Sequence, residues 1–145
     1  MTDETVFQRY ELKYLLTREQ RQAVLRAMEP YMRPDPHSKT TICNLYFDTA
    51  DYRLIRRSID SPIYKEKLRI RSYGPVAPES TVFVELKKKY QKLVSKRRVA
   101  MAEKKAMDWL VNGGYSATNQ IAREIDYCLH LYPSLYPTAY LCYNR

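Results

Sequence analysis

Hydrophobic and polar residues alternate along several segments of the chain, and this period of two is typical of β-strands with one covered face. The alternation is clearest over residues 64–73 (YKEKLRIRSY) and 81–89 (TVFVELKKK). Gly74, Pro75 and Pro78 lie between these segments and favour a loop, so we expect a hairpin. Similar patterns, rich in β-branched and aromatic residues, predict further strands over residues 7–16, 40–47, 92–100 and 138–145.

Helical spacing of apolar residues marks the segments between these strands. Thr17 followed by Gln20 has the spacing of a capping box, and the apolar residues that follow predict a helix over 18–32. Three more helices are expected, over residues 48–58, 101–111 and 117–131. Gly113 favours a helix end just after the third of these four helices, and Ser116 is the expected N-cap of the last.

The strand predicted over 64–73 is charged on one side and apolar on the other. Its charged face contains Lys65, Lys67, Arg69 and Arg71. Leu68 and Ile70 lie on the opposite face, which needs a cover of helices. Like charges about 6.5–7 Å apart repel one another unless an anion lies between them, and a phosphate ligand would relieve that repulsion. The alternative is an ordinary solvated sheet face.

The chain has 145 residues, of which 45% are apolar, and this is within the range of one domain. It carries 25 Lys and Arg against 16 Asp and Glu, and the net charge of +9 attracts polyanions. The excess lies on predicted strand faces, whose charged residues are Arg9, Glu11, Lys13, Lys65, Lys67, Arg69, Arg71, Glu85, Lys87, Lys89, Lys96, Arg98 and Arg145. Almost no aromatic residues interleave with these cations, which disfavours nucleic acid as the partner.

Several other classes of protein are disfavoured by the sequence. No apolar run approaches the roughly 20 residues of a membrane span, and the polar, acidic N-terminus is unlike a signal peptide, so we expect no membrane span and a cytoplasmic location. Three cysteines (Cys43, Cys128 and Cys142) and two histidines form no CxxC pair, which excludes a disulfide framework or a structural zinc site. We interpret all three cysteines as inert buried thiols.

Six short motifs occur in order along the chain. They are RYELKYLL at 9–16, NLYFDT at 44–49, KLRIRSYG at 67–74, VELKKK at 84–89, VSKRR at 94–98 and YNR at 143–145. Together they resemble the VTC domain, the polyphosphate polymerase domain of vacuolar transporter chaperone proteins, which belongs to the triphosphate tunnel metalloenzymes. The resemblance covers nearly the whole chain as a single domain. Members of the related CYTH group begin with ExExK, and Arg9 replaces the first of these carboxylates, which favours the VTC branch.

The resemblance implies an α+β fold in which an antiparallel β-barrel tunnel, complete or incomplete, has helices packed outside it. It also implies polyphosphate synthesis or binding, with the γ-phosphoryl group of ATP transferred to a polyphosphate chain in a basic tunnel. The implied partners are polyphosphate and ATP or another triphosphate, and the implied cofactor is a divalent metal, Mn²⁺ or Mg²⁺. The alternatives are a triphosphate hydrolase or cyclase of the CYTH type and a non-catalytic polyanion-binding domain.

The same resemblance implies roles for individual residues. The catalytic group is Lys13, Arg69, Arg71 and Lys87. The phosphate-binding group is Lys67, Lys89, Lys96, Arg98 and Arg145. Glu11 and Glu85 are candidate metal ligands, although each could instead pair with a neighbouring lysine, Lys13 or Lys87. Arginine suits such a site because its planar group can hold two phosphate oxygens at once.

Domains of this family continue beyond the YNR strand, with strands that close the tunnel and a glutamate that helps to hold the metal. We therefore expect this chain to lack the C-terminal strands of the domain. An incomplete barrel exposes two strand edges, one of them at 138–145, and we expect either self-association through strand pairing or a collapsed, partly open tunnel.

Overall fold

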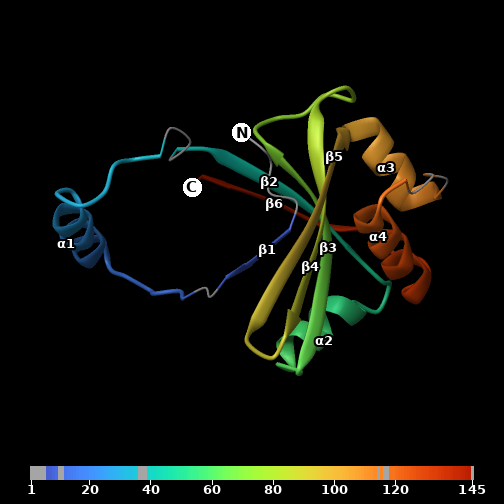
Figure 1. The fold of residues 1–145 in the computed structure, drawn as a ribbon, viewed down its shortest axis with the longest axis horizontal. Helices are drawn as coiled ribbons and strands as arrows, with labels where there is room; N and C mark the ends of the chain where they lie inside the picture. Colours follow the sequence, from blue (N-terminus) through green and yellow to red (C-terminus); the bar gives the residue numbers. More distant parts are fainter. Residues whose placement is uncertain (1–5, 10–11, 36–38, 114, 116–117, 145) are drawn as a thin grey trace.

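The computed structural model describes residues 6–9, 12–35, 39–113, 115 and 118–144 of the chain. Its strands are β1 (Val6–Arg9), β2 (Thr41–Asp48), β3 (Tyr64–Tyr73), β4 (Thr81–Tyr90), β5 (Leu93–Ala102) and β6 (Tyr136–Asn144). Its helices are α1 (Arg18–Met28), α2 (Arg53–Ile59), α3 (Glu103–Asn112) and α4 (Gln120–Leu131). Figure 1 shows α3 and α4 against one side of a twisted sheet and α1 far out on the other side.

The six strands form one sheet in the order β1-β5-β4-β3-β2-β6, and every neighbouring pair is antiparallel. The predicted hairpin of β3 and β4 is present, with Ile70 opposite Val84. Within the described residues β1 and β6 are the two edges of the sheet and do not pair with each other. The predicted α+β fold with helices outside an antiparallel sheet is therefore confirmed, and the barrel is an open one.

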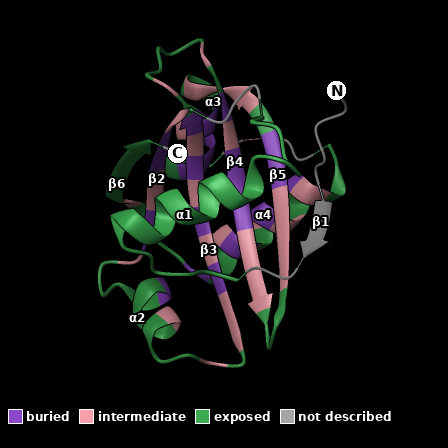
Figure 2. Ribbon diagram, turned by 90° about the vertical axis from the view of Figure 1, so that its left-hand side faces the viewer, coloured by how far each residue is buried: buried purple, intermediate pink, exposed green. Residues whose placement is uncertain are grey.

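The hydrophobic core lies between the sheet and helices α3 and α4. Leu68 of β3 and Leu86 of β4 are fully buried, and Trp109 of α3 and Ile125 of α4 pack against the same cluster. Each such side chain contributes about 1.5–3 kcal/mol when it leaves water. Figure 2 shows this buried band along the middle of β3, β4 and β5. The helix cover that the apolar face of β3 requires is thus provided.

Local hydrogen bonds set the ends of the helices. In α1 both bonds of the predicted capping box form, with the Gln20 amide nitrogen donating to Thr17 Oγ1 and the Thr17 amide donating to Gln20 Oε1. Helix α3 ends at Gly113, which has a φ of 73° that favours glycine. Helix α4 is capped by Asn119, whose Oδ1 accepts from the Ala122 amide at 2.8 Å. The predicted cap Ser116 lies outside the described residues.

Asp48, at the end of β2, holds the short helix α2 in place. Its Oδ1 accepts from the Leu54 amide at 2.8 Å and its Oδ2 accepts from the Ile55 amide at 3.0 Å. A carboxylate at a helix N-terminus is favoured by the helix dipole as well as by these bonds. Helix α2 begins at Arg53, later than predicted, because Tyr52 adopts a left-handed conformation with φ of 57°.

The first predicted strand is shorter than its alternation suggests. β1 pairs with β5 from Val6 opposite Arg97 to Arg9 opposite Val94, and residues 12–16 are not in a strand. The reason is that β5 begins at Leu93, so the pairing surface ends just beyond Arg9. A period-two pattern without a partner strand does not form a strand.

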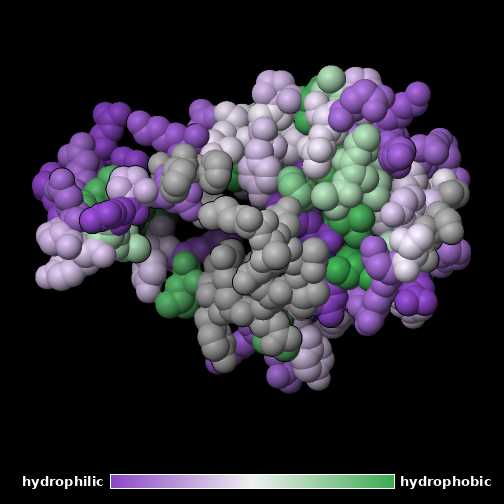
Figure 3. Space-filling view, turned by 45° about the horizontal axis from the view of Figure 1, so that its top comes forward, coloured by the Kyte–Doolittle hydropathy of each residue, from purple (hydrophilic) through white to green (hydrophobic). Residues whose placement is uncertain are grey.

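The segment that carries α1 stands away from the body of the molecule. Helix α1 has no buried residue, and Leu15 and Tyr31 on either side of it are largely exposed. The arm projects from the body in the ribbon view and in the space-filling view (Figures 1 and 3). Among the described residues, no helix is long and apolar enough to cross a membrane.

Candidate functional site

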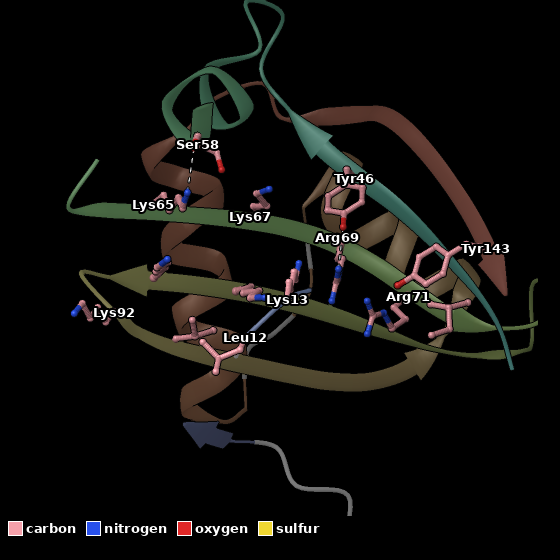
Figure 4. A pocket seen from close by; sticks show the side chains of 14 residues that line it. Leu12, Lys13, Tyr46, Ser58, Lys65, Lys67, Arg69, Arg71, Lys92 and Tyr143 are labelled. Atoms are coloured by element: carbon pink, nitrogen blue, oxygen red, sulfur yellow. Dashed lines mark hydrogen bonds between the residues drawn. The ribbon is translucent and has the colours of Figure 1, made fainter. Parts of the chain in front are cut away.

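A groove of about 1020 Å³ lies on the sheet face that points away from α3 and α4 (Figure 4). Its cationic lining residues are Lys13, Lys65, Lys67, Arg69, Arg71, Lys87, Lys89 and Lys92. Within the described part of the chain, no Asp or Glu is among the lining residues. Cations gathered in a hollow focus a positive potential, so the groove attracts anions.

The register of β3 and β4 places these cations in facing rows. Lys65 is opposite Lys89, Lys67 is opposite Lys87, and Arg69 is opposite Glu85. Alternate residues of a strand point to the same side, so the cations of one row are about 6.5–7 Å apart. Like charges directly opposite each other destabilise a sheet. The rows therefore need compensating negative charge, and Glu85 supplies part of it.

Glu85 lies at the centre of the cationic face and has no exposed surface. Its Oε2 accepts from Nε and Nη2 of Arg69 at 3.0 and 2.8 Å, and its Oε1 accepts from Nε of Arg98 at 3.0 Å. Lys96 Nζ is 3.6 Å from Oε1, and Arg71 Nε is 3.8 Å from Oε2. One buried carboxylate thus holds together cations from β3 and β5.

The charges around Glu85 decide its ionisation. Burial alone raises the pKa of the Glu85 carboxyl, but the charges of Arg69 and Arg71 outweigh burial, so the pKa lies below its usual range. The pKa of Lys96 is also lowered, first by burial and then by the positive charges of Arg98 and Arg71, against the effect of Glu85. The site therefore holds an ionised carboxylate among crowded cations.

Residues of β2 orient the two arginines of β3. Arg69 donates from Nη1 to the Tyr46 hydroxyl at 2.9 Å, and Figure 4 shows these side chains pointing toward each other. Arg71 donates from Nε to Asn44 Oδ1 at 2.9 Å. Lys65 donates from Nζ to the Ser58 carbonyl of α2 at 3.1 Å. The cations of β3 are thus held in defined positions by neighbouring elements.

The structure brings most of the predicted site residues together. Those that line the groove are Lys13, Lys67, Arg69, Arg71, Lys87 and Lys89. Lys96 and Arg98 do not line it but lie beside Glu85, and Arg98 is buried with its guanidinium 3.8 Å from the Phe83 ring centre. Glu11 and Arg145 lie outside the described residues.

The divalent metal implied by the resemblance does not fit the side chains that the structure describes. In the described ranges no three His, Cys, Asp or Glu residues form a group that could hold a metal ion. Both oxygens of Glu85 already accept hydrogen bonds from arginines, and four cations surround it, so an added cation would be repelled. The partners of Glu85 are Arg69 and Arg98 rather than Lys87, which the sequence suggested.

Sequence reasoning missed the polar side chains of β2. Asn44 is 1% exposed and hydrogen-bonded to Arg71, and Tyr46 contacts Arg69. Both belong to the NLYFDT motif and lie two residues apart, which places them on one face of a strand. The signal was present in that spacing, but only the register of β2 against β3 shows which face of the sheet they share.

The fold is similar to that of a solved structure. A crystal structure from Bacillus halodurans, described as that of a "putative adenylate cyclase", matches with a TM-score of 0.56 and 16% identity over 98% of this chain. The match spans 64% of the length of that protein. At this identity the similarity shows that the two proteins share a fold. No curated protein matches this chain.

The sequence itself gives a more specific match. The model of the VTC domain family matches residues 8–145, which include the strands that form the basic groove and all but the start of β1. The matched range contains all six motifs in full, so it agrees with the motifs read along the chain. The chain therefore belongs to the VTC domain family.

Proposed function

We propose that the basic groove binds an extended chain of phosphates, inorganic polyphosphate, and that the domain transfers the γ-phosphoryl group of ATP to such a chain. The observation that carries this proposal is the row of cations along β3, which lines the groove and faces Lys87 and Lys89 of β4. A row with a repeat of about 6.5–7 Å suits a ligand whose charge repeats along its length better than a compact anion.

Arg71 is the best placed residue for holding phosphate. A guanidinium has five N–H donors. Arg71 donates one of them to Asn44, and the other four have no hydrogen-bond partner among the described residues. Arg69 donates three, two to Glu85 and one to Tyr46. Arg71 therefore contacts the ligand most strongly, and Arg69 mainly shapes the site.

Phosphoryl transfer suits a site of this kind because it needs in-line positioning and charge neutralisation more than a covalent partner. The lysines and arginines of the groove would hold the phosphates in line and neutralise charge on the transferred group. The resemblance to the triphosphate tunnel metalloenzymes implies a divalent metal as cofactor. Because the described side chains do not fit a divalent metal, the only contribution that we assign to them is that of their own positive charges.

The first test is calorimetric binding of long-chain polyphosphate and of ATP to the purified chain at two salt concentrations. We expect polyphosphate to bind more tightly per molecule, with an affinity that falls steeply as salt rises. Arg71→Ala should weaken binding by about 1.5–3 kcal/mol, or roughly tenfold to more than a hundredfold. Equal affinity for ATP and polyphosphate would contradict an extended site.

Two adjacent lysines of β4 give a matched control. Lys87 lines the groove, whereas Lys88 lies on the helix-covered face, 3.7 Å from Glu124 of α4. Lys87→Ala and Lys88→Ala remove the same charge one residue apart. We expect only Lys87→Ala to weaken polyphosphate binding markedly; equal losses would mean that net charge rather than the groove is responsible.

Activity is a separate question from binding. The chain is incubated with ATP and Mn²⁺ or Mg²⁺, and polyphosphate, free phosphate and cyclic nucleotide are measured in the same samples. The proposed transfer of the γ-phosphoryl group would be supported if polyphosphate grew with the wild-type chain and did not grow with Arg71→Ala. Release of phosphate or formation of a cyclic nucleotide in its place would identify a hydrolase or a cyclase, and binding without turnover would leave a polyanion-binding domain.

A further inference from the structure

Two cysteines face each other across β2 and β6. Cys43 of β2 is directly opposite Cys142 of the edge strand β6, and their Sγ atoms are 2.9 Å apart in a hydrogen bond between free thiols. Directly opposite residues of antiparallel strands have Cα atoms about 4.5–5.5 Å apart. A disulfide needs a Cα separation of about 4.4–6.8 Å, and directly opposite residues fall within that range.

The two thiols differ in their surroundings. Cys43 is buried with 6% of its surface exposed, whereas Cys142 is exposed. The hydrogen bond with Cys142, helped by one with Tyr140, lowers the pKa of Cys43, and the same bond raises the pKa of Cys142. The lowered pKa favours thiolate formation at Cys43, within a hydrogen bond that joins the two sulfur atoms. The sequence-based interpretation of three buried thiols is wrong for Cys142.

Cys128 provides an internal contrast. It is buried in α4 within the hydrophobic core, and burial raises its pKa to about 12. A thiol reacts with oxidants as its thiolate, so a buried thiol with a raised pKa is inert. The interpretation from sequence therefore fits Cys128, and the reactive pair is the one at the edge of the sheet.

We propose that Cys43 and Cys142 form a reversible disulfide, a redox modification site that fastens the edge strand β6 to β2, with a peroxide as the oxidant. This proposal rests on the facing pair of sulfur atoms and does not depend on what the groove binds.

The chemistry balances with one molecule of hydrogen peroxide. The Cys43 thiolate attacks a peroxide oxygen, the O–O bond breaks, and hydroxide leaves and is protonated to water, which gives a sulfenic acid on Cys43. The Cys142 sulfur then attacks the Cys43 sulfur, the S–S bond forms and the S–O bond breaks. The departing hydroxide takes the Cys142 proton and leaves as the second water. A dithiol reductant reverses the change.

The bond would act on an edge strand of the sheet. Within the described residues β6 pairs only with β2, and most of its residues are exposed. Tyr143, the neighbour of Cys142, lines the groove on the other face of β6. Strands held by one neighbour open more readily than central strands, and a covalent link would suppress that opening.

The test treats the full chain with hydrogen peroxide and measures its intact mass and its tryptic peptides. Trypsin leaves Cys43 in peptide 40–53 and both other cysteines in peptide 124–145, so the experiment is done with wild type and with Cys128→Ser. We expect a mass loss of two hydrogen atoms and a joined pair of these peptides in both proteins, and neither in Cys142→Ser. Oxygen addition without a joined pair, or a disulfide-linked dimer in their place, would overturn the proposal.

A second measurement tests the fastening of β6. Amide hydrogen exchange is compared between the reduced and oxidised chain. We expect slower exchange in β6 of the oxidised chain, little change in the central strand β4, and a return to the original rates after reduction with dithiothreitol. Unchanged exchange in β6 would show that the bond does not fasten this strand.

Discussion

The two faces of the central strands are both buried in part, but they are stabilised in different ways. On the face covered by α3 and α4, Val84 and Leu86 have no exposed surface and pack against apolar side chains. On the opposite face Glu85, between them in sequence, is equally buried but is surrounded by cations. The comparison shows that burial alone does not distinguish the two faces. The helix-covered face is stabilised by apolar area removed from water, whereas the basic face is stabilised by the charge of one carboxylate, Glu85.

The helices on the two sides of the sheet also differ in how much they bury. α3 and α4 bury Leu110, Ile125 and other residues against the sheet. α1, on the side of the basic face, buries none of its residues. The apolar face is therefore closed, whereas the basic face keeps a groove lined by cations, beside which four cations share the buried carboxylate of Glu85. That imbalance of charge is what leaves the groove able to attract an anionic ligand.

The sharpest test of this comparison removes the carboxylate. Glu85→Gln leaves the arginines and Lys96 without their shared buried counter-charge, and the loss of one partner of a buried pair costs about 3–5 kcal/mol. We expect the free energy of unfolding, measured by urea denaturation, to fall by this amount.

Glu79→Gln, at an exposed position before β4, is the control and should be nearly neutral. If Glu85→Gln behaved like that control, the basic face would not depend on its carboxylate. Polyphosphate should raise the stability of Glu85→Gln more than that of wild type, because bound phosphate would replace the missing charge.

The second test compares the helices on the two sides with the same substitution. Leu110→Ala in α3 opens a cavity at a residue that is 4% exposed, and we expect a loss of about 2–5 kcal/mol. Leu25→Ala in α1 changes a side chain that is 48% exposed, and we expect a change within about 0.5 kcal/mol. Urea denaturation measures both. A large loss in Leu25→Ala would mean that α1 packs against the body.

The third test uses pH. Because the pKa of Glu85 is lower in the folded protein than in the unfolded chain, the ionised carboxylate stabilises the fold fully above the unfolded value of about 4.3. This stabilisation is lost as the pH falls from there through the lower folded value. We expect the unfolding free energy of wild type to decrease over that range more steeply than that of Glu85→Gln. Parallel curves would contradict the lowered pKa.

Much of this architecture could be predicted from the pattern of residues. Alternation in β3 and β4 predicted both strands, their pairing and the face that carries the cations, because a period of two leaves little choice of face once one side is apolar. The need for helices over Leu68 and Ile70 followed from the same pattern.

What could not be predicted depends on contacts between segments far apart in the chain. The role of Glu85 needed the register of three strands, which alternation within one strand does not provide. The length of β1 depended on where β5 begins. The pairing of Cys43 with Cys142 joins residues separated by most of the chain. Local patterns fix the face of a side chain, but only tertiary structure fixes its partner.

The smallest expected effect concerns α1 alone. Thr17→Ala removes one bond of the capping box, and loss of an N-cap costs a helix about 1 kcal/mol. Because α1 has no buried residue, this loss should destabilise the helix without changing the unfolding of the sheet. Amide exchange should therefore become faster in α1, while the urea midpoint followed by Trp109 fluorescence in the core stays unchanged. Asn119→Ala, which removes the cap of the packed helix α4, is the matched control and should lower that midpoint. If both variants lowered it, α1 would be coupled to the basic face as tightly as α4 is to the apolar one, and the contrast between the two sides would be lost.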